Sequence, residues 1–161
     1  MAEYKGVMVF CDIADGKLAA IATEGLGAGR KLADELGEQL SAVIIGDGVS
    51  GLDQSAISAG ADKVYVSDDP LLKNYQADAY LAVMEKAAKE AMPQIIIMGQ
   101  TAVGRSLAPS LAFRLETTVT LDCIDLSIDA GSKRLLQTKP VYGGNAQAIF
   151  TTDTNPQIVT V

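Results

Sequence analysis

The fold is decided by the stretch Ile95-Ile96-Ile97-Met98-Gly99-Gln100-Thr101-Ala102-Val103-Gly104-Arg105, a short apolar run followed by a segment with two glycines. Four consecutive apolar residues are typical of a parallel strand that helices cover on both faces. Leu107, Leu111 and Leu115 then recur at a helical spacing. A strand, a glycine-containing loop and a helix in this order form the repeating unit of a parallel α/β sheet.

The same alternation fills the sequence before this stretch. Short apolar runs at Val7–Cys11, Ala42–Ile45 and Val64–Val66 predict three more strands of the same kind. Strands that alternate with helices are joined by right-handed crossovers. We therefore expect an α/β fold with three layers, α/β/α, around a mainly parallel sheet.

Three helices are predicted between these strands, with their ends marked by local signals. The first runs through Ala22–Leu36 and stops at Gly37. Ser50 is expected to cap the second helix, which Gly60 ends. The third covers Tyr75–Met92, where alanine, leucine and methionine residues make one apolar stripe.

The last third of the chain has a different pattern. Apolar and polar residues alternate over Ile124–Ile128, as in a strand that is exposed on one side. Leu135–Val141, Ala146–Thr152 and Gln157–Val161 are further strand candidates. We expect these segments to form a C-terminal antiparallel β extension of one domain that spans residues 1–161.

Composition excludes several classes of function. The chain has 161 residues, with 13 Lys and Arg against 20 Asp and Glu, a net charge of −7. An acidic chain without a basic run argues against nucleic-acid binding. With no histidine, it cannot supply a Ser-His-Asp triad or a histidine-ligated metal. Neither a secretory signal nor the roughly 20 apolar residues of a membrane helix is present, so a cytoplasmic protein is expected.

The remaining reactive side chains have simple structural interpretations. Cys11 and Cys123 lie in apolar stretches and are expected to be buried, reduced thiols. Asp68-Asp69-Pro70 is expected to be a solvated turn rather than a metal site. Asp12 and Asp15 flank the end of the first strand, where Gly16 makes a turn the simple explanation. No metal site is predicted.

The segment Gly99–Arg105 supports two interpretations. If Ser106 is the N-cap, Pro109 falls at the third helical position, where its missing N–H costs nothing. The segment is then a loop at the carboxyl end of a strand, where backbone amides and an arginine can hold an anion or a nucleotide. The alternative is a tight turn whose arginine is exposed or paired with a carboxylate, and the residue pattern alone favours this turn.

A second loop, Tyr142-Gly143-Gly144-Asn145, lies between two predicted strands. Its glycines and asparagine tolerate the positive φ angles of a tight connection, so a hairpin turn is one interpretation. The other is a loop whose bare backbone lets a partner or a cofactor approach closely. The spacing does not decide between them.

At these residues the chain resembles a known family over essentially its whole length, the N-terminal domain of the electron transfer flavoprotein alpha subunit. The landmarks that carry the resemblance, in chain order, are Gly60–Val66 with Asp68-Asp69-Pro70, Tyr75–Tyr80, Gly99–Pro109, Ala112–Leu115, Lys139–Ala146 and Pro156–Val161. Ser106 stands where the family often has aspartate, and Ala102 where serine is common.

The resemblance implies an adenine nucleotide alpha hydrolase-like fold and a heterodimer with a beta subunit. It implies an electron carrier that takes electrons from flavin dehydrogenases, such as acyl-CoA dehydrogenases, and passes them to a quinone reductase. FAD in this family is held mainly by a C-terminal domain of the alpha subunit, which we expect to be absent from this chain. No cofactor is therefore expected on this chain alone, and its isolated apolar faces favour self-association.

The resemblance thus implies a scaffold without catalytic residues, which contacts the beta subunit and positions the flavin domain. The candidate interface or cofactor-proximal residues are Gly99, Thr101, Gly104, Arg105, Tyr142, Gly143, Gly144 and Asn145. The alternative function is that of a stand-alone nucleotide-binding protein of the universal stress protein type, with the Gly99–Arg105 loop holding the phosphates.

Overall fold

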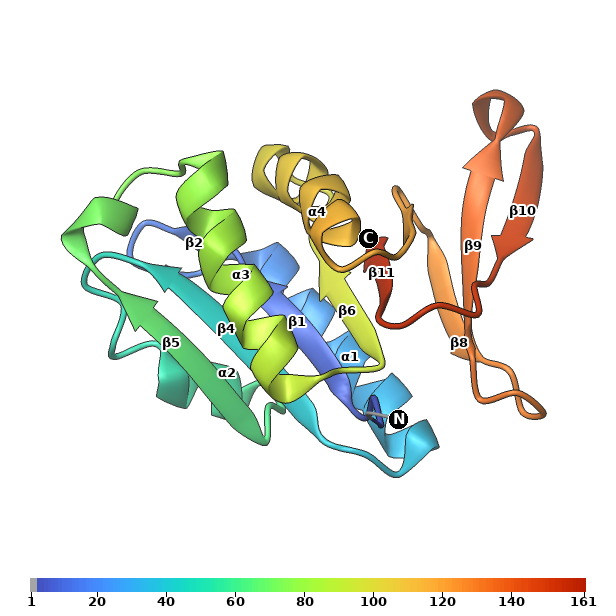
Figure 1. The fold of residues 1–161 in the computed structure, drawn as a ribbon, viewed down its shortest axis with the longest axis horizontal. Helices are drawn as coiled ribbons and strands as arrows, with labels where there is room; N and C mark the ends of the chain where they lie inside the picture. Colours follow the sequence, from blue (N-terminus) through green and yellow to red (C-terminus); the bar gives the residue numbers. More distant parts are fainter. Residues whose placement is uncertain (1–2) are drawn as a thin grey trace.

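Six parallel strands form the centre of the molecule, in a computed structural model that describes residues 3–161. They are β1 (Val7–Cys11), β4 (Leu40–Gly46), β5 (Lys63–Asp68), β6 (Ile95–Met98), β7 (Val119–Thr120) and β11 (Gln157–Thr160). Their order across the sheet is β5-β4-β1-β6-β11-β7 (Figure 1). A small hairpin, β2 (Ile13–Ala14) with β3 (Lys17–Leu18), follows β1.

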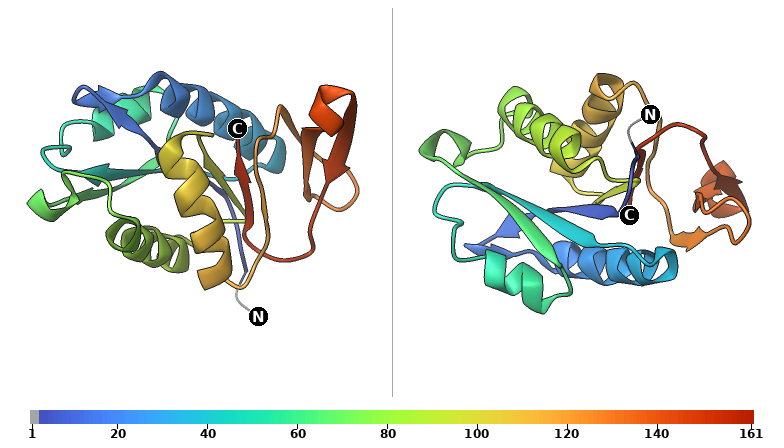
Figure 2. Two further views of the ribbon diagram at one scale, coloured as in Figure 1. Left: turned by 90° about the horizontal axis from the view of Figure 1, so that it is seen from above. Right: turned by 60° about the horizontal axis from the view of Figure 1, so that its bottom comes forward.

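Helices cover both faces of this sheet, which confirms the predicted three layers. The helices α1 (Ala20–Leu36) and α2 (Asp53–Ser58) pack on one face, and α3 (Ala77–Ala91) and α4 (Ala102–Arg114) on the other (Figure 2). A short 3₁₀ segment, η1 (Pro70–Leu72), precedes α3. No helix among residues 3–161 is both long enough and apolar enough to cross a membrane.

The core has two halves because successive strand side chains point to opposite faces. Val7, Val9 and Cys11 of β1 pack with α1 and α2, whereas Met8 and Phe10 pack with α3 and α4. Every residue of β1 and of β6 is buried. This double burial explains why these strands are continuous apolar runs in the sequence.

The antiparallel extension consists of β8 (Asp125–Ile128), β9 (Leu135–Val141) and β10 (Ala146–Phe150), in the order β10-β9-β8. The 3₁₀ segment η2 (Tyr142–Gly144) joins β9 to β10. These two strands project from the body as an arm, residues 135–150 (Figure 1). The strand β8 lies beside α1, and its Leu126 and Ile128 join the core on that face.

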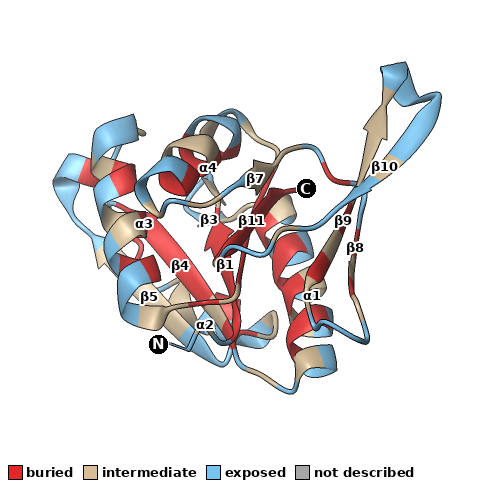
Figure 3. Ribbon diagram, turned by 45° about the vertical axis from the view of Figure 1, so that its right-hand side comes forward, coloured by how far each residue is buried: buried red, intermediate tan, exposed pale blue. Residues whose placement is uncertain are grey.

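The expectation that Gln157–Val161 belongs to the extension is wrong. The strand β11 returns to the main sheet and pairs in parallel with both β6 and β7. All four of its residues are buried, whereas β10 is largely exposed (Figure 3). The chain therefore forms the antiparallel sheet after β7 and before β11, which are neighbouring strands of the main sheet.

The predicted C-terminal ends of the first and third helices are confirmed, but both helices start two residues from the predicted position and the predicted cap of the second is wrong. Gly37 adopts a left-handed conformation (φ 69°) directly after α1, as a glycine C-cap does. The second helix begins at Asp53, after Leu52, and Ser50 does not cap it. The Ser50 side chain instead donates to the Asp68 carboxylate, which also accepts from the backbone N–H groups of residues 48, 49 and 50.

Asp68 is the last residue of β5 rather than part of the predicted turn, and these hydrogen bonds occupy its exposed carboxylate. The hydrogen bonds from Ser50 and from the backbone amides lower the pKa of its carboxyl group. The neighbouring Asp69 accepts the Leu71 N–H at 2.8 Å and caps η1. Among residues 3–161, no three His, Cys, Asp or Glu side chains gather as a metal site would require.

Candidate functional site

The carboxyl ends of β1, β4 and β6 meet at one edge of the sheet. The strands β4 and β5 lie on one side of β1, and β6, β11 and β7 lie on the other. The order of strand addition therefore reverses between β1 and β6. In open α/β sheets, ligands bind in the crevice that forms at such a reversal.

Asp12 stands in this crevice, directly after β1. Its Oδ1 accepts a hydrogen bond from the Thr101 hydroxyl at 3.1 Å, and Thr101 Oγ1 accepts the Gly104 N–H at 3.1 Å. The other oxygen, Oδ2, is buried and has no hydrogen-bond partner. Burial raises the pKa of the Asp12 carboxyl group, and the Thr101 hydrogen bond opposes this rise.

Thr101, not Ser106, is the N-cap of the fourth helix. The backbone of Thr101 is extended, its side chain accepts from the Gly104 N–H, and helical geometry starts at Ala102. The predicted Ser106 cap and the predicted Gly99–Arg105 loop are therefore wrong, because only Gly99–Thr101 is connecting loop. Pro109 lies inside the helix, where a proline is normally avoided, but both flanking turns bury apolar residues against the sheet.

Gly104 permits a close approach between α4 and this loop, and Gly99 permits a close approach of the loop to α1 and Asp12. A Cβ atom on Gly104 would lie 1.9 Å from the Gly99 carbonyl oxygen. A Cβ atom on Gly99 would lie 2.7 Å from Ile21 Cγ1 and 3.1 Å from Asp12 Oδ2. Both positions therefore require glycine for packing, whether or not a ligand is present.

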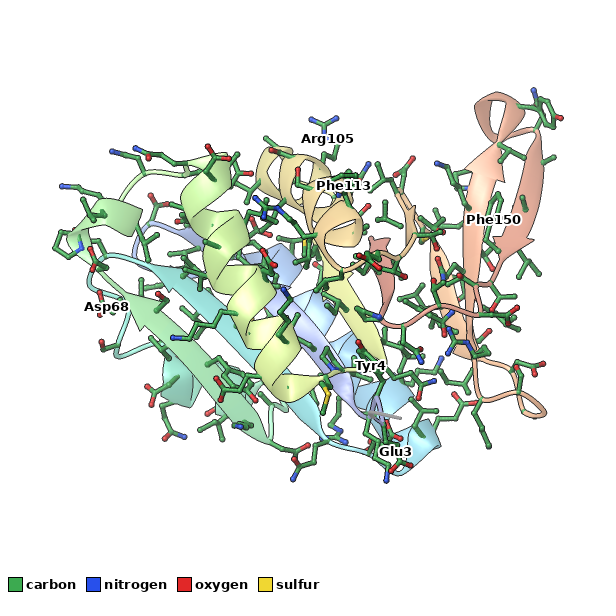
Figure 4. All side chains as sticks on the ribbon, in the orientation of Figure 1. Glu3, Tyr4, Asp68, Arg105, Phe113 and Phe150 are labelled. Atoms are coloured by element: carbon green, nitrogen blue, oxygen red, sulfur yellow. The ribbon has the colours of Figure 1, made fainter. Side chains whose placement is uncertain are left out.

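Arg105 does not take part in the crevice. It is exposed on the first turns of α4 and projects away from the helix (Figure 4). It joins none of the ion pairs found among residues 3–161. The anion-loop interpretation requires a positive charge at the strand ends. The Arg105 guanidinium instead lies away from them.

A cavity of about 290 Å³ lies beside Asp12 at the ends of β1 and β4. Its charged lining residues are Asp12, Asp47 and Lys73, and Tyr75 and Tyr80 line it as well. The Tyr80 hydroxyl donates to the Leu72 carbonyl at 3.0 Å, and the Tyr75 hydroxyl donates to Ser106 at 2.8 Å. The two tyrosine hydroxyls are thus bonded to groups outside this lining, whereas Asp12 Oδ2 in the lining has no partner.

The second candidate loop is remote from this crevice. Residues Tyr142–Asn145 form the tip of the arm and are all exposed. Tyr142, Gly143 and Gly144 have φ angles of 52°, 65° and 89°, and the Asn145 side chain donates to the Tyr142 carbonyl at 3.0 Å. The structure therefore separates the eight candidate residues into two groups, one at the sheet edge and one at the arm tip.

The cysteines offer no nucleophile. Burial raises the pKa of Cys11 to about 12 and that of Cys123 to about 11. A thiol with such a pKa is fully protonated at neutral pH and is inert. The burial expected for both side chains is confirmed.

Sequence reasoning missed the role of Asp12, because its partner Thr101 is 89 residues away in the chain. The available signal was its position. A carboxylate directly after a fully buried strand, in an α/β pattern, is placed at the ligand edge of the sheet. The motif after β6 begins at the same edge, so the two could have been brought together from topology.

We expect Asp12→Asn to stabilise the protein at pH 7 by about 1 kcal/mol, because the buried, unpaired oxygen no longer carries charge. Burial raises the pKa of the Asp12 carboxyl group in the folded state, so its ionisation destabilises the folded protein above that pKa. This destabilisation is lost as the pH falls through the raised pKa towards the pKa of the unfolded chain. Thermal unfolding should therefore show a gain of about 2–4 °C at neutral pH that shrinks towards pH 4.

Asp15→Asn is the matched control for this change, because Asp15 is exposed in the nearby turn between β2 and β3. It should shift the free energy of unfolding by less than about 0.5 kcal/mol at either pH. A gain for Asp12→Asn that does not depend on pH would contradict the assignment of the effect to the buried charge.

The residues define an open, mainly parallel α/β sheet with a carboxylate at the reversal of strand order and a projecting antiparallel arm. Residues 7–161 match the family model described as the electron transfer flavoprotein domain, and the chain belongs to this family. It is 46% identical to the electron transfer flavoprotein subunit alpha of Thermoanaerobacterium thermosaccharolyticum, over 100% of this chain and 49% of that protein.

Two further relatives carry the same name. The subunit of Clostridium acetobutylicum is 41% identical over 99% of this chain and 48% of its own length. The subunit of Megasphaera elsdenii is 41% identical over 100% of this chain and 48% of its own length. The chain thus spans about half the length of these curated relatives.

Proposed function

We propose that the chain is the N-terminal domain of an electron transfer flavoprotein alpha subunit and serves as a scaffold without catalytic residues. It contacts the beta subunit and positions the domain that holds FAD. The assembled protein takes electrons from flavin dehydrogenases, such as acyl-CoA dehydrogenases, and passes them to a quinone reductase in the cytoplasm. The identities of 41–46% over the whole chain support the family part of this proposal.

The observation that supports a scaffold role is the position of the Asp12 carboxylate. The N-terminus of a helix in this fold is where an anionic ligand would be bound. Here the N-cap Thr101 already donates to Asp12, so the protein's own carboxylate lies at that place. The negative charge of the Asp12 carboxylate would repel an anionic ligand at this place, and its volume would exclude the ligand sterically.

The residues at this edge do not fit FAD. The cavity of about 290 Å³ is at or below the lower limit of ordinary ligand pockets, and FAD is larger than a drug-sized ligand. Two carboxylates and a single lysine line it, a charge balance that disfavours a pyrophosphate. We therefore assign no flavin contact to this crevice.

The same observations weigh against the nucleotide-binding alternative. A universal stress protein type of site would hold phosphates in the Gly99–Arg105 segment. Asp12 lies within hydrogen-bonding distance of Thr101 in that segment, and Arg105 is exposed outside the crevice. The Gly99 and Gly104 positions are also explained by packing alone.

Calorimetric titration of the purified chain with ATP, AMP and FAD tests the proposal. We expect no heat beyond that of dilution for all three ligands and no flavin absorbance in the purified protein. Micromolar binding of ATP would favour the nucleotide-binding alternative over the scaffold. A yellow protein with bound flavin would contradict the assignment of FAD to another domain.

A further inference from the structure

The two edges of the main sheet differ in length. The strand β7 at one edge consists of Val119–Thr120 only, and a very short strand is one way in which proteins protect an edge. The strand β5 at the other edge has six residues and pairs only with β4 among the strands of residues 3–161. It lies at the opposite end of the molecule from the arm (Figure 1). The long open edge of this sheet is therefore β5.

Every second residue of β5 directs its backbone groups to the open side. The Asp62 N–H donates to the Leu40 carbonyl of β4 at 2.8 Å, and the backbone groups of successive strand residues point alternately to the two sides. The backbone groups of the two valines of β5 therefore face β4. Those of Lys63, Tyr65 and Ser67 face the open side, where they are free to bond another strand.

Apolar side chains surround this edge. Ile57, Val66 and Leu71 are 45%, 40% and 80% exposed. Ile57 lies on α2, which packs against β5, and Leu71 lies on η1 directly after β5. An open groove of about 420 Å³ lies between β5 and α3, and its mainly apolar lining includes Tyr65 and Val83. Exposed apolar side chains that gather at one edge indicate an interaction surface.

The charges at the two ends of β5 favour a second copy of the chain as the occupant. The strand begins at Lys63, and Asp68 and Asp69 stand at its other end, with no charge between them. When two such strands pair antiparallel, the basic end of each lies beside the acidic end of the other, whereas parallel pairing brings like charges together. The edge is thus complementary to itself about a twofold axis.

We propose that two copies of this chain pair antiparallel through β5, about a twofold axis at Tyr65. In this register Tyr65 lies opposite Tyr65 of the second copy, and Lys63 lies opposite Ser67. All three outward-facing residues then exchange backbone hydrogen bonds. Lys63 is also diagonal to Asp69 of the second copy, within reach of a long side chain. This inference does not depend on the proposed function.

The contact is small, so the pairing is expected to be weak. Three residue pairs and a few apolar side chains bury less surface than a stable dimer needs. We expect a dissociation constant above about 100 µM. The chain then stays monomeric at micromolar concentration, and a disulfide across the axis is needed to trap the dimer.

Tyr65→Cys tests the register directly. Opposite residues whose backbones bond each other in an antiparallel pair have Cα atoms about 5.5 Å apart, which suits a disulfide. Lys63→Cys is the matched control, because Lys63 is exposed on the same strand but pairs with Ser67, so its two thiols lie too far apart. Under mild oxidation at about 0.5 mM chain, the Tyr65 variant should form dimer at least about tenfold faster than the Lys63 variant.

A mixture of Lys63→Cys and Ser67→Cys chains gives the same test without replacing Tyr65, and it should form mixed dimers. The wild-type chain gives the background, because both of its own cysteines are buried, and circular dichroism checks that each variant is folded. A folded Tyr65→Cys chain that forms no dimer would overturn the inference and leave the proposed function standing. Equal rates for the two single variants, or a mixture without mixed dimers, would overturn it as well.

Discussion

Gly104→Ala is expected to destabilise the protein by at least about 3 kcal/mol, or to prevent folding. The added Cβ would lie 1.9 Å from the Gly99 carbonyl oxygen, and both groups are backbone-bound. No side-chain rotation relieves such a contact, so the start of α4 must move away from the end of β6. Urea unfolding followed by circular dichroism measures the loss.

Gly27→Ala provides a control of opposite sign. Gly27 lies within α1, is exposed and has nothing within 4 Å of the position of a Cβ atom. Alanine there should stabilise the helix by about 0.5–1 kcal/mol, since glycine is a poor helix former. A Gly104→Ala variant as stable as the wild type would show that the close packing of loop and helix is wrong.

Gln157→Leu is expected to cost about 2–4 kcal/mol. Gln157 is fully buried in β11, and its side-chain amide bonds to both backbone groups of Leu135, at 2.9 Å and 3.1 Å. The strand β10 ends at Phe150, opposite Gln137, and therefore does not reach Leu135. The Gln157 side-chain amide makes the two hydrogen bonds to Leu135 that a longer β10 would have made. Leucine has a similar volume but leaves a buried N–H and a buried C=O unpaired.

The measurement combines urea unfolding with hydrogen exchange at the Leu135 amide. Exchange at this amide should become faster by more than the change in global stability allows. The control is Gln54→Leu on the exposed side of α2, which should change the free energy of unfolding by less than about 0.5 kcal/mol. Unchanged protection of Leu135 in the Gln157 variant would show that the amide does not join the two sheets.

Much of the main sheet could be predicted because its strands are local apolar runs. Val7–Cys11 and Ile95–Met98 are buried on both faces. Strands in this environment are continuous apolar runs in any parallel sheet. The end of α1 was equally accessible, since Gly37 is a local stop signal. These features depend on a few neighbouring residues.

The features that could not be predicted are those set by distant contacts. Gln157–Val161 has the pattern of a strand, but nothing local says which sheet it joins. The choice of Ser106 as a cap followed from the rule that Pro109 avoids a helix interior, which burial of the helix overrides here. The partners Asp12 and Thr101, and Gln157 and Leu135, are brought together only by the sheet order.

The site shows the same division. The chain could be assigned to a family from its motifs, whereas the role of Gly99 and Gly104 as interface or cofactor-proximal residues stays a prediction. Their use for packing, and the exposure of Arg105, follow from where α4 begins, which depends on the Thr101 side chain. The suggestion that Tyr142–Asn145 contacts a partner stays a prediction.

The most direct test of the central claim is the mass of the complex that this chain forms with the beta subunit of the same organism. Size-exclusion chromatography with light scattering should be run on an equimolar mixture at micromolar concentration. A scaffold domain is expected to give one peak at the sum of the two masses. Two peaks at the masses of the separate chains would contradict the assignment of this domain as the scaffold that contacts the beta subunit.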